Sequence, residues 1–80
     1  MRALIAANFS GWVDHVEQCL AEARARFAEE ADMRALAELA LNVMEGGVMQ
    51  SRTFRDIGPF DRAVAQYRAH LQALTTKAVA

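Results

Sequence analysis

The sequence predicts an all-α domain of three helices per chain that pairs with a second copy of itself. Glycine and proline are scarce, strand-like alternation is absent, and good helix formers dominate the composition. Hydrophobic residues make up 54% of the 80 residues, a high share for one small domain with few ways to bury that surface internally. The composition therefore favours oligomerisation, or a piece of a larger protein, over an independent monomer.

The first helix is expected over residues 2–28. Its apolar positions keep helical spacing throughout: Ile5, Phe9, Trp12, Val16, Cys19, Ala23 and Phe27. Ser10, followed by Gly11, could start a new helix as an N-cap, because glycine costs about 1 kcal/mol inside a helix. Since the apolar stripe keeps its phase across that point, we predict one continuous helix.

The second helix is expected over residues 33–55, with Asp32 as its N-cap. Its polar positions form one narrow stripe: Arg34, Glu38, Asn42, Glu45 and Arg52. Two apolar rows flank that stripe: Leu36, Ala40, Val43, Gly47 and Phe54 on one side, and Ala37, Leu41, Met44 and Val48 on the other. A helix that is apolar nearly all round must be buried nearly all round, and two further helices are too few to surround it. The segment therefore points to a partner, most simply a second copy.

Two adjacent glycines, Gly46 and Gly47, lie in the middle of this second helix. Together they cost about 1–2 kcal/mol relative to alanine, so a compensating contact is expected. Close approach of another helix backbone is the first explanation, and a local kink is the second. A phosphate-binding loop is excluded, because the flanking strand and the remaining motif residues are missing.

The third helix is expected over residues 59–75, and Pro59 suits its first position because proline has no N–H to leave unpaired. Its apolar residues follow one another at alternating spacings of four and three: Phe60, Val64, Tyr67, Leu71 and Leu74. Such a narrow seam is typical of a coiled-coil or bundle contact. Residues from Thr76 onward are expected to fray.

Charge and targeting features exclude several classes of protein. The net charge is −1, which gives no long-range attraction to nucleic acid. No apolar run reaches the roughly 18 residues of a membrane helix, and the N-terminus lacks a convincing signal peptide. The single cysteine, Cys19, excludes an internal disulfide and favours a reducing, cytoplasmic location. We therefore expect neither nucleic acid nor a membrane as a partner of these residues.

Candidate chemistry is sparse. His15, Cys19 and Glu22 share one side of the first helix, but a metal site would need further ligands from His70 or a partner chain. A buried cysteine beside a partly exposed histidine is the simpler interpretation, so we expect no metal and no cofactor. No local signature of a catalytic triad is present, and we expect no enzymatic activity. A mixed aromatic and polar flank of the same helix suits the rim of a small-molecule pocket: Asn8, Trp12, His15 and Cys19.

The segment 35–52, ALAELALNVMEGGVMQSR, resembles the penultimate long helix of tetracycline-repressor-like (TetR-family) transcription regulators. As in that family, it is followed by a short turn with Asp and Pro and by a final helix carrying Phe60, Tyr67 and Leu71. The preceding segment, residues 9–26, also looks like the helix that comes before these two. Phe27 departs from the pattern, because relatives often have a glycine there that ends the helix.

The resemblance implies a C-terminal effector-sensing and dimerisation domain, with residues 1–80 as one domain fragment. Its last two helices would pair with those of a second copy in an intermolecular four-helix bundle. DNA would be bound only through an N-terminal helix-turn-helix that is absent here, and a small-molecule effector would bias the geometry of the two subunits. The alternative is a free-standing helical module that binds a different protein through the same faces.

The expected dimer interface draws on both of the last two helices. Its residues are Ala40, Val43, Gly46, Gly47, Gln50, Phe54, Phe60, Val64, Tyr67, Leu71 and Leu74.

Overall fold

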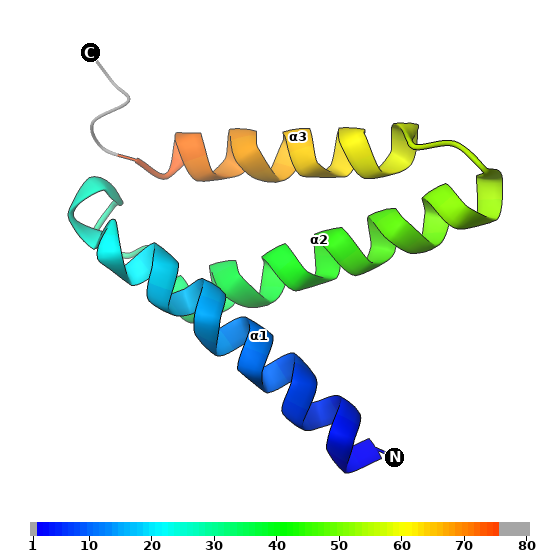
Figure 1. Ribbon diagram of the computed structural model, residues 1–80. Coiled ribbons are helices and arrows are strands. Elements are labelled where there is room, and N and C mark those ends of the chain that lie inside the picture. Colours follow the sequence, from blue (N-terminus) through cyan, green and yellow to red (C-terminus); the bar gives the residue numbers. More distant parts are fainter. Residues whose placement is uncertain (1, 76–80) are drawn as a thin grey trace.

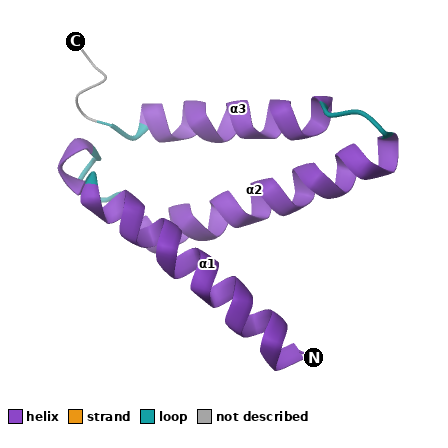
Figure 2. Ribbon diagram, viewed as in Figure 1, coloured by secondary structure: helices purple, strands orange, loops and turns teal. Residues whose placement is uncertain are grey.

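The computed structural model describes residues 2–75, which form three long helices and one short 3₁₀ turn (Figures 1 and 2). The helices are α1 (Arg2–Glu22), α2 (Met33–Phe54) and α3 (Gly58–Ala73), and the 3₁₀ turn η1 (Arg24–Arg26) follows α1. Within residues 2–75 there is no strand, although one isolated antiparallel bridge joins Phe27 to Thr75. The expected all-α fold with three helices is confirmed, whereas the fraying expected from Thr76 lies outside the described residues.

The three helices form a flat, open arrangement. α2 and α3 lie side by side and run antiparallel, while α1 crosses α2 and its N-terminal end points away from both (Figure 1). The molecule measures 40 × 31 × 15 Å, and its radius of gyration is 14.3 Å. A compact domain of this length is expected to have a radius of gyration of about 12 Å. The helices therefore leave much of their surface uncovered.

The hydrophobic core is small and lies where α1 and α3 meet α2. Among the described residues, four hydrophobic side chains are buried: Val13, Leu36, Ala37 and Ala40. Nine large apolar side chains remain exposed: Leu4, Ile5, Phe9, Trp12, Leu39, Val48, Met49, Phe54 and Ile57. The chain alone thus does not surround α2, which is the situation that its nearly all-round apolar sequence predicts.

The start of α2 follows the expected capping chemistry. The side chain of Asp32 accepts a hydrogen bond of 3.1 Å from the backbone N–H of Ala35, so Asp32 is the N-cap. At the other end, α2 stops at Phe54, within one residue of the prediction. α1 runs without interruption through Ser10 and Gly11, which confirms one continuous helix at that point.

The turn between α2 and α3 is a Schellman motif with an unusual residue in it. Arg55 has φ 52° and ψ 46°, the left-handed conformation that helices most often give to glycine. The N–H of Asp56 donates to the carbonyl of Ser51 at 3.0 Å, and the N–H of Arg55 donates to that of Arg52. The hydroxyl of Ser51 also accepts a hydrogen bond of 3.2 Å from the N–H of Phe60, in the first turn of α3. One serine thus helps to end α2 and to start α3.

The expected end of the first helix at residue 28 is wrong, because α1 ends at Glu22 and η1 follows. Phe27 is extended, with φ −94° and ψ 156°. This conformation lets the N–H of Ala28 donate to the carbonyl of Leu74, at 2.8 Å, directly after the C-terminal end of α3. The guanidinium of Arg24 donates to loop carbonyls that a longer helix would not present: those of Ala28, Glu29 and Ala31.

Replacing Arg55 by glycine is expected to stabilise the fold. A left-handed conformation costs a residue with a Cβ about 1–2 kcal/mol, and glycine lacks that penalty. We expect Arg55→Gly to raise the free energy of unfolding by about 1 kcal/mol after the larger unfolded-state entropy of glycine is offset. Urea unfolding followed by circular dichroism measures the change. Arg55→Ala is the control: an equal gain there would attribute the effect to lost charge instead.

Candidate functional site

Gly47 of α2 lies close to the backbone of Phe60 in α3. A Cβ built on Gly47 would lie 3.1 Å from the Cα of Phe60, which is tighter than ordinary van der Waals contact. Gly47 is also buried. The close helix approach that the glycine pair predicts is therefore present at Gly47, and the approaching helix is α3 of the same chain.

A tyrosine holds α3 against the first turns of α2. The hydroxyl of Tyr67 donates a hydrogen bond of 2.7 Å to the backbone carbonyl of Leu36. Burial raises the pKa of the Tyr67 phenol, because removal from water disfavours the charged phenolate. Only the neutral phenol can donate to the carbonyl, so this hydrogen bond requires the protonated side chain.

An apolar groove remains between α2 and α3. Its volume is about 240 Å³, and it is lined by Ala40, Val43, Met44, Phe60, Val64 and Tyr67. A second groove of about 280 Å³ adjoins the turn and is lined by Val48, Ser51, Arg52, Ile57 and Phe60. Phe60 lines both grooves, so the two grooves adjoin at the N-terminal end of α3.

The residues expected at a dimer interface fall into three groups by exposure. Ala40 and Gly47 are buried within the chain, whereas Gln50 and Phe54 are exposed. The remaining seven are half-buried: Val43, Gly46, Phe60, Val64, Tyr67, Leu71 and Leu74. Five of the eleven line the 240 Å³ groove, together with Met44, which the prediction omitted although it lies on an apolar row of α2.

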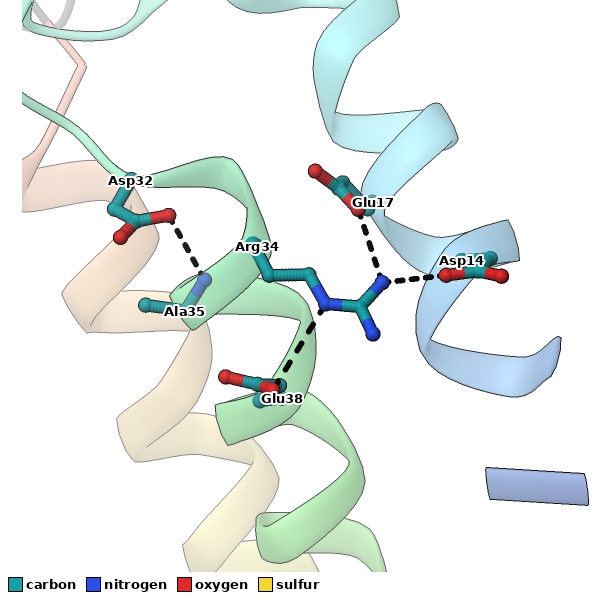
Figure 3. A network of polar contacts seen from close by, with 6 residues as sticks. All are labelled: Asp14, Glu17, Asp32, Arg34, Ala35 and Glu38. Atoms are coloured by element: carbon teal, nitrogen blue, oxygen red, sulfur yellow. Dashed lines mark hydrogen bonds and ion pairs between the residues drawn. The ribbon is translucent and has the colours of Figure 1, made fainter. Parts of the chain in front are cut away.

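An ion cluster that was not predicted from the sequence joins α1 to α2. The guanidinium of Arg34 on α2 contacts Asp14 and Glu17 on α1, the latter at 3.2 Å, and lies 3.8 Å from Glu38 (Figure 3). The hydrogen bond with Asp14, and then that with Glu17, raises the pKa of Arg34. Arg34 was expected on the polar stripe, and the acidic pair one helical turn apart on α1 is the signal that identifies its partner.

The residues expected at a pocket rim lie on one side of α1. Asn8, Trp12 and His15, with Ala7 and Gly11, line a surface groove of about 390 Å³. All five residues belong to α1, so this groove is bounded by a single helix. Cys19, the fourth residue of the expected rim, lies outside this lining. It is exposed, so the expectation of a buried cysteine is wrong: the face of α1 that carries Cys19 is not covered by α2 or α3.

Two kinds of site find no support in the part of the chain that the structure describes. No cluster of three or more His, Cys, Asp or Glu side chains in residues 2–75 is arranged to hold a metal ion. No described helix combines the length and the apolar character needed to cross a membrane.

Loss of the Tyr67 hydroxyl is expected to remove a pH-dependent contribution to stability. Tyr67→Phe should lower the free energy of unfolding by about 0.5–1.5 kcal/mol at neutral pH, the usual value of one hydrogen bond. Because the folded-state pKa of Tyr67 is raised, its contribution is complete below the ordinary pKa of about 10 and is lost as the pH rises through the raised value. Thermal unfolding at several pH values from 8 upward measures both effects. An equal alkaline loss in parent and variant would contradict the assignment.

Comparison with protein-family models matches residues 1–66 to a model described as the C-terminal domain of LmrA/YxaF-like transcriptional regulators. A search of curated proteins found no match, and neither did a search of solved structures. The matched segment contains α1, η1, the whole of α2 and the first half of α3. It also contains the segment 35–52 on which the sequence resemblance rests. The chain therefore belongs to the family of C-terminal domains of LmrA/YxaF-like regulators, within the TetR family.

Proposed function

We propose that this chain is the dimerisation and effector-sensing part of a TetR-family regulator and that it forms a homodimer through α2 and α3. Membership of the family supports a role in a transcription regulator. Two antiparallel helices from each copy would make a four-helix bundle when the α2–α3 layers meet face to face. DNA binding would belong to another domain of the regulator, and the cytoplasm is the proposed location.

The observation that carries the proposal is the large surface of the single chain. Its accessible surface is 6152 Å², whereas a compact monomer of 8.8 kDa is expected to expose about 4,800 Å². The excess is larger than the roughly 800 Å² that each partner buries in an ordinary protein–protein interface. A second copy would cover this excess without any further folding of the chain.

The α2–α3 layer has the chemistry that such a contact needs. The 240 Å³ groove between the helices is lined by apolar side chains and by Tyr67, and the exposed Leu39 lies on the same helix as Val43. Burying apolar surface from two copies drives association, whereas burying unpaired charge opposes it. The absence of charged residues from this groove lining supports self-association.

Effector sensing is proposed for the groove on α1. Trp12 offers an apolar ring, and Asn8 and His15 offer hydrogen-bonding groups on the same side of the helix. A small molecule bound in this groove would change the angle between α1 and α2, the two helices that the ion pairs of Arg34 connect. In the intact regulator, a ligand acts by preferring one geometry of the two subunits over another.

The chain is expected to be dimeric at tens of micromolar concentration. Light scattering after size exclusion should give about twice the chain mass of 8.8 kDa, and dilution should lower the mass toward that of one chain. Glu38→Ala, on the exposed polar stripe of α2, is the control and should leave the mass unchanged. A folded chain that stays at 8.8 kDa at every concentration would contradict the proposal and favour the alternative of a different protein partner.

A further inference from the structure

One positive charge serves three carboxylates where α1 crosses α2. The guanidinium of Arg34, in the first turn of α2, contacts Asp14 and Glu17 of α1 (Figure 3). Glu38, one turn further along α2, lies 3.8 Å from the same side chain. The four side chains are between 37% and 68% exposed, so dissolved ions reach them. Negative charge is therefore in excess at this crossing, and Arg34 is the cation that lies between the carboxylates of the two helices.

Little apolar burial supports α1 besides this cluster. Val13, directly before Asp14, is the one residue of α1 that is buried, and every residue that precedes it from residue 2 onward is exposed. The half-buried residues of α1 are Val16, Glu17 and Leu20. The N-terminal end of the helix accordingly points away from α2 and α3 (Figure 1). One short stretch of α1 thus carries both the apolar contact and the ion pairs, and it determines the direction of the exposed half.

The C-terminal end of α1 has a separate anchor. In the connection that follows α1, the N–H of Ala28 donates to the carbonyl of Leu74 at 2.8 Å. The guanidinium of Arg24 donates to the carbonyl of Ala31, also at 2.8 Å. Both acceptors are backbone carbonyls, and neither bond involves the cluster around Arg34. Loss of the cluster would therefore leave this end of α1 attached, so that the helix would swing about it.

The contact between α2 and α3 uses uncharged groups. Tyr67 donates to the carbonyl of Leu36, the N–H of Phe60 donates to the hydroxyl of Ser51, and Phe60 also packs against Gly47. Within residues 2–75, no ion pair joins α2 to α3. Screening of charge by salt should therefore act on the α1–α2 crossing and leave the α2–α3 pair intact.

We propose that the crossing of α1 over α2 is a salt-sensitive joint, from which the N-terminal half of α1 swings away when the charges around Arg34 are screened or reversed. Little buried apolar surface holds α1 in place, so a small electrostatic change is enough to shift the population of its positions. The groove on Asn8, Trp12 and His15 moves with the helix, and its position thus depends on the ionic conditions. The inference is independent of dimerisation and of effector binding, because every contact that it uses lies within one chain.

Distances between spin labels on exposed residues measure the swing. In a chain that carries Cys19→Ser, labels at Ala6→Cys and Ala69→Cys report the distance from α1 to α3, and labels at Asn42→Cys and Ala69→Cys report that from α2 to α3. Dilution into excess unlabelled chain restricts the measurement to distances within one chain. As sodium chloride rises from about 0.01 M to about 1 M, the screening length falls from about 30 Å to about 3 Å. We expect the main α1–α3 distance to lose most of its amplitude to longer distances, while the α2–α3 distance stays unchanged.

Charge reversal tests the cluster itself at low salt. Arg34→Glu places a fourth carboxylate at the crossing, so we expect it to produce at low salt the α1–α3 distances that the parent shows at high salt. Adding Asp14→Arg and Glu17→Arg to that variant restores opposite charges on the two helices and should restore the parent distance. Arg68→Glu is the matched control, because Arg68 is exposed on α3 and forms no ion pair within residues 2–75.

The other outcomes would overturn the inference. An α1–α3 distance that responds neither to salt nor to Arg34→Glu would show that apolar packing alone holds the crossing. Equal responses to Arg34→Glu and Arg68→Glu would attribute the effect to net charge. Simultaneous loss of both distances in the parent would mean that the three helices come apart as one unit. If Arg34→Glu also loses the α2–α3 distance, that variant has unfolded, and the salt series on the parent decides.

Discussion

The contact between α2 and α3 determines how the rest of the chain is arranged. Near the start of α2, the hydroxyl of Tyr67 donates to the carbonyl of Leu36. Further along α2, Gly47 leaves space for Phe60, and near the turn the hydroxyl of Ser51 accepts from the N–H of Phe60. These contacts fix the register of α3 along α2, because Tyr67 and Phe60 meet α2 at well-separated levels. The positions of the grooves and of the uncovered faces then follow from that register.

α1 is attached by a different kind of interaction. It meets α2 through the buried Val13 and through the ion cluster around Arg34, while the first half of the helix remains exposed. Ion pairs between exposed groups contribute little to stability, and salt weakens them further. The molecule therefore combines two helices joined by hydrogen bonds and close packing with a third that is joined by one buried side chain and by ion pairs.

Local rules predicted most of the fold. The 3.6-residue period located three helices, Asp32 was recognised as an N-cap, and the glycine pair indicated a close helix approach. The early end of α1 was not predictable from the spacing of apolar residues. It depends on hydrogen bonds from Arg24 to carbonyls up to seven residues later, and such bonds do not change the apolar pattern. The partner of Arg34 was likewise missed, since an ion pair between helices depends on tertiary placement.

The candidate site was predictable only in composition. Five of the residues expected at an interface do line one groove, because the seam of α3 and one apolar row of α2 face each other. The sequence does not distinguish a seam that faces its own chain from one that faces a copy, since both require the same apolar spacing. Gly46 and Gly47 show the difficulty: they are identical in the sequence, and the 100° between them gives them different neighbours.

The hydrogen bond from Ala28 to Leu74 has a consequence for the order in which the chain acquires its structure. It joins the connection after α1 to the end of α3, so the whole of α2 and α3 separates its donor from its acceptor. During synthesis, α1 and α2 are made before Leu74, so the N–H of Ala28 lacks this acceptor until the last helix has been made. Closing so long a loop costs entropy before the bond can form. The hydrogen bond that joins the first connection to the end of α3 therefore forms late, although its donor is made early.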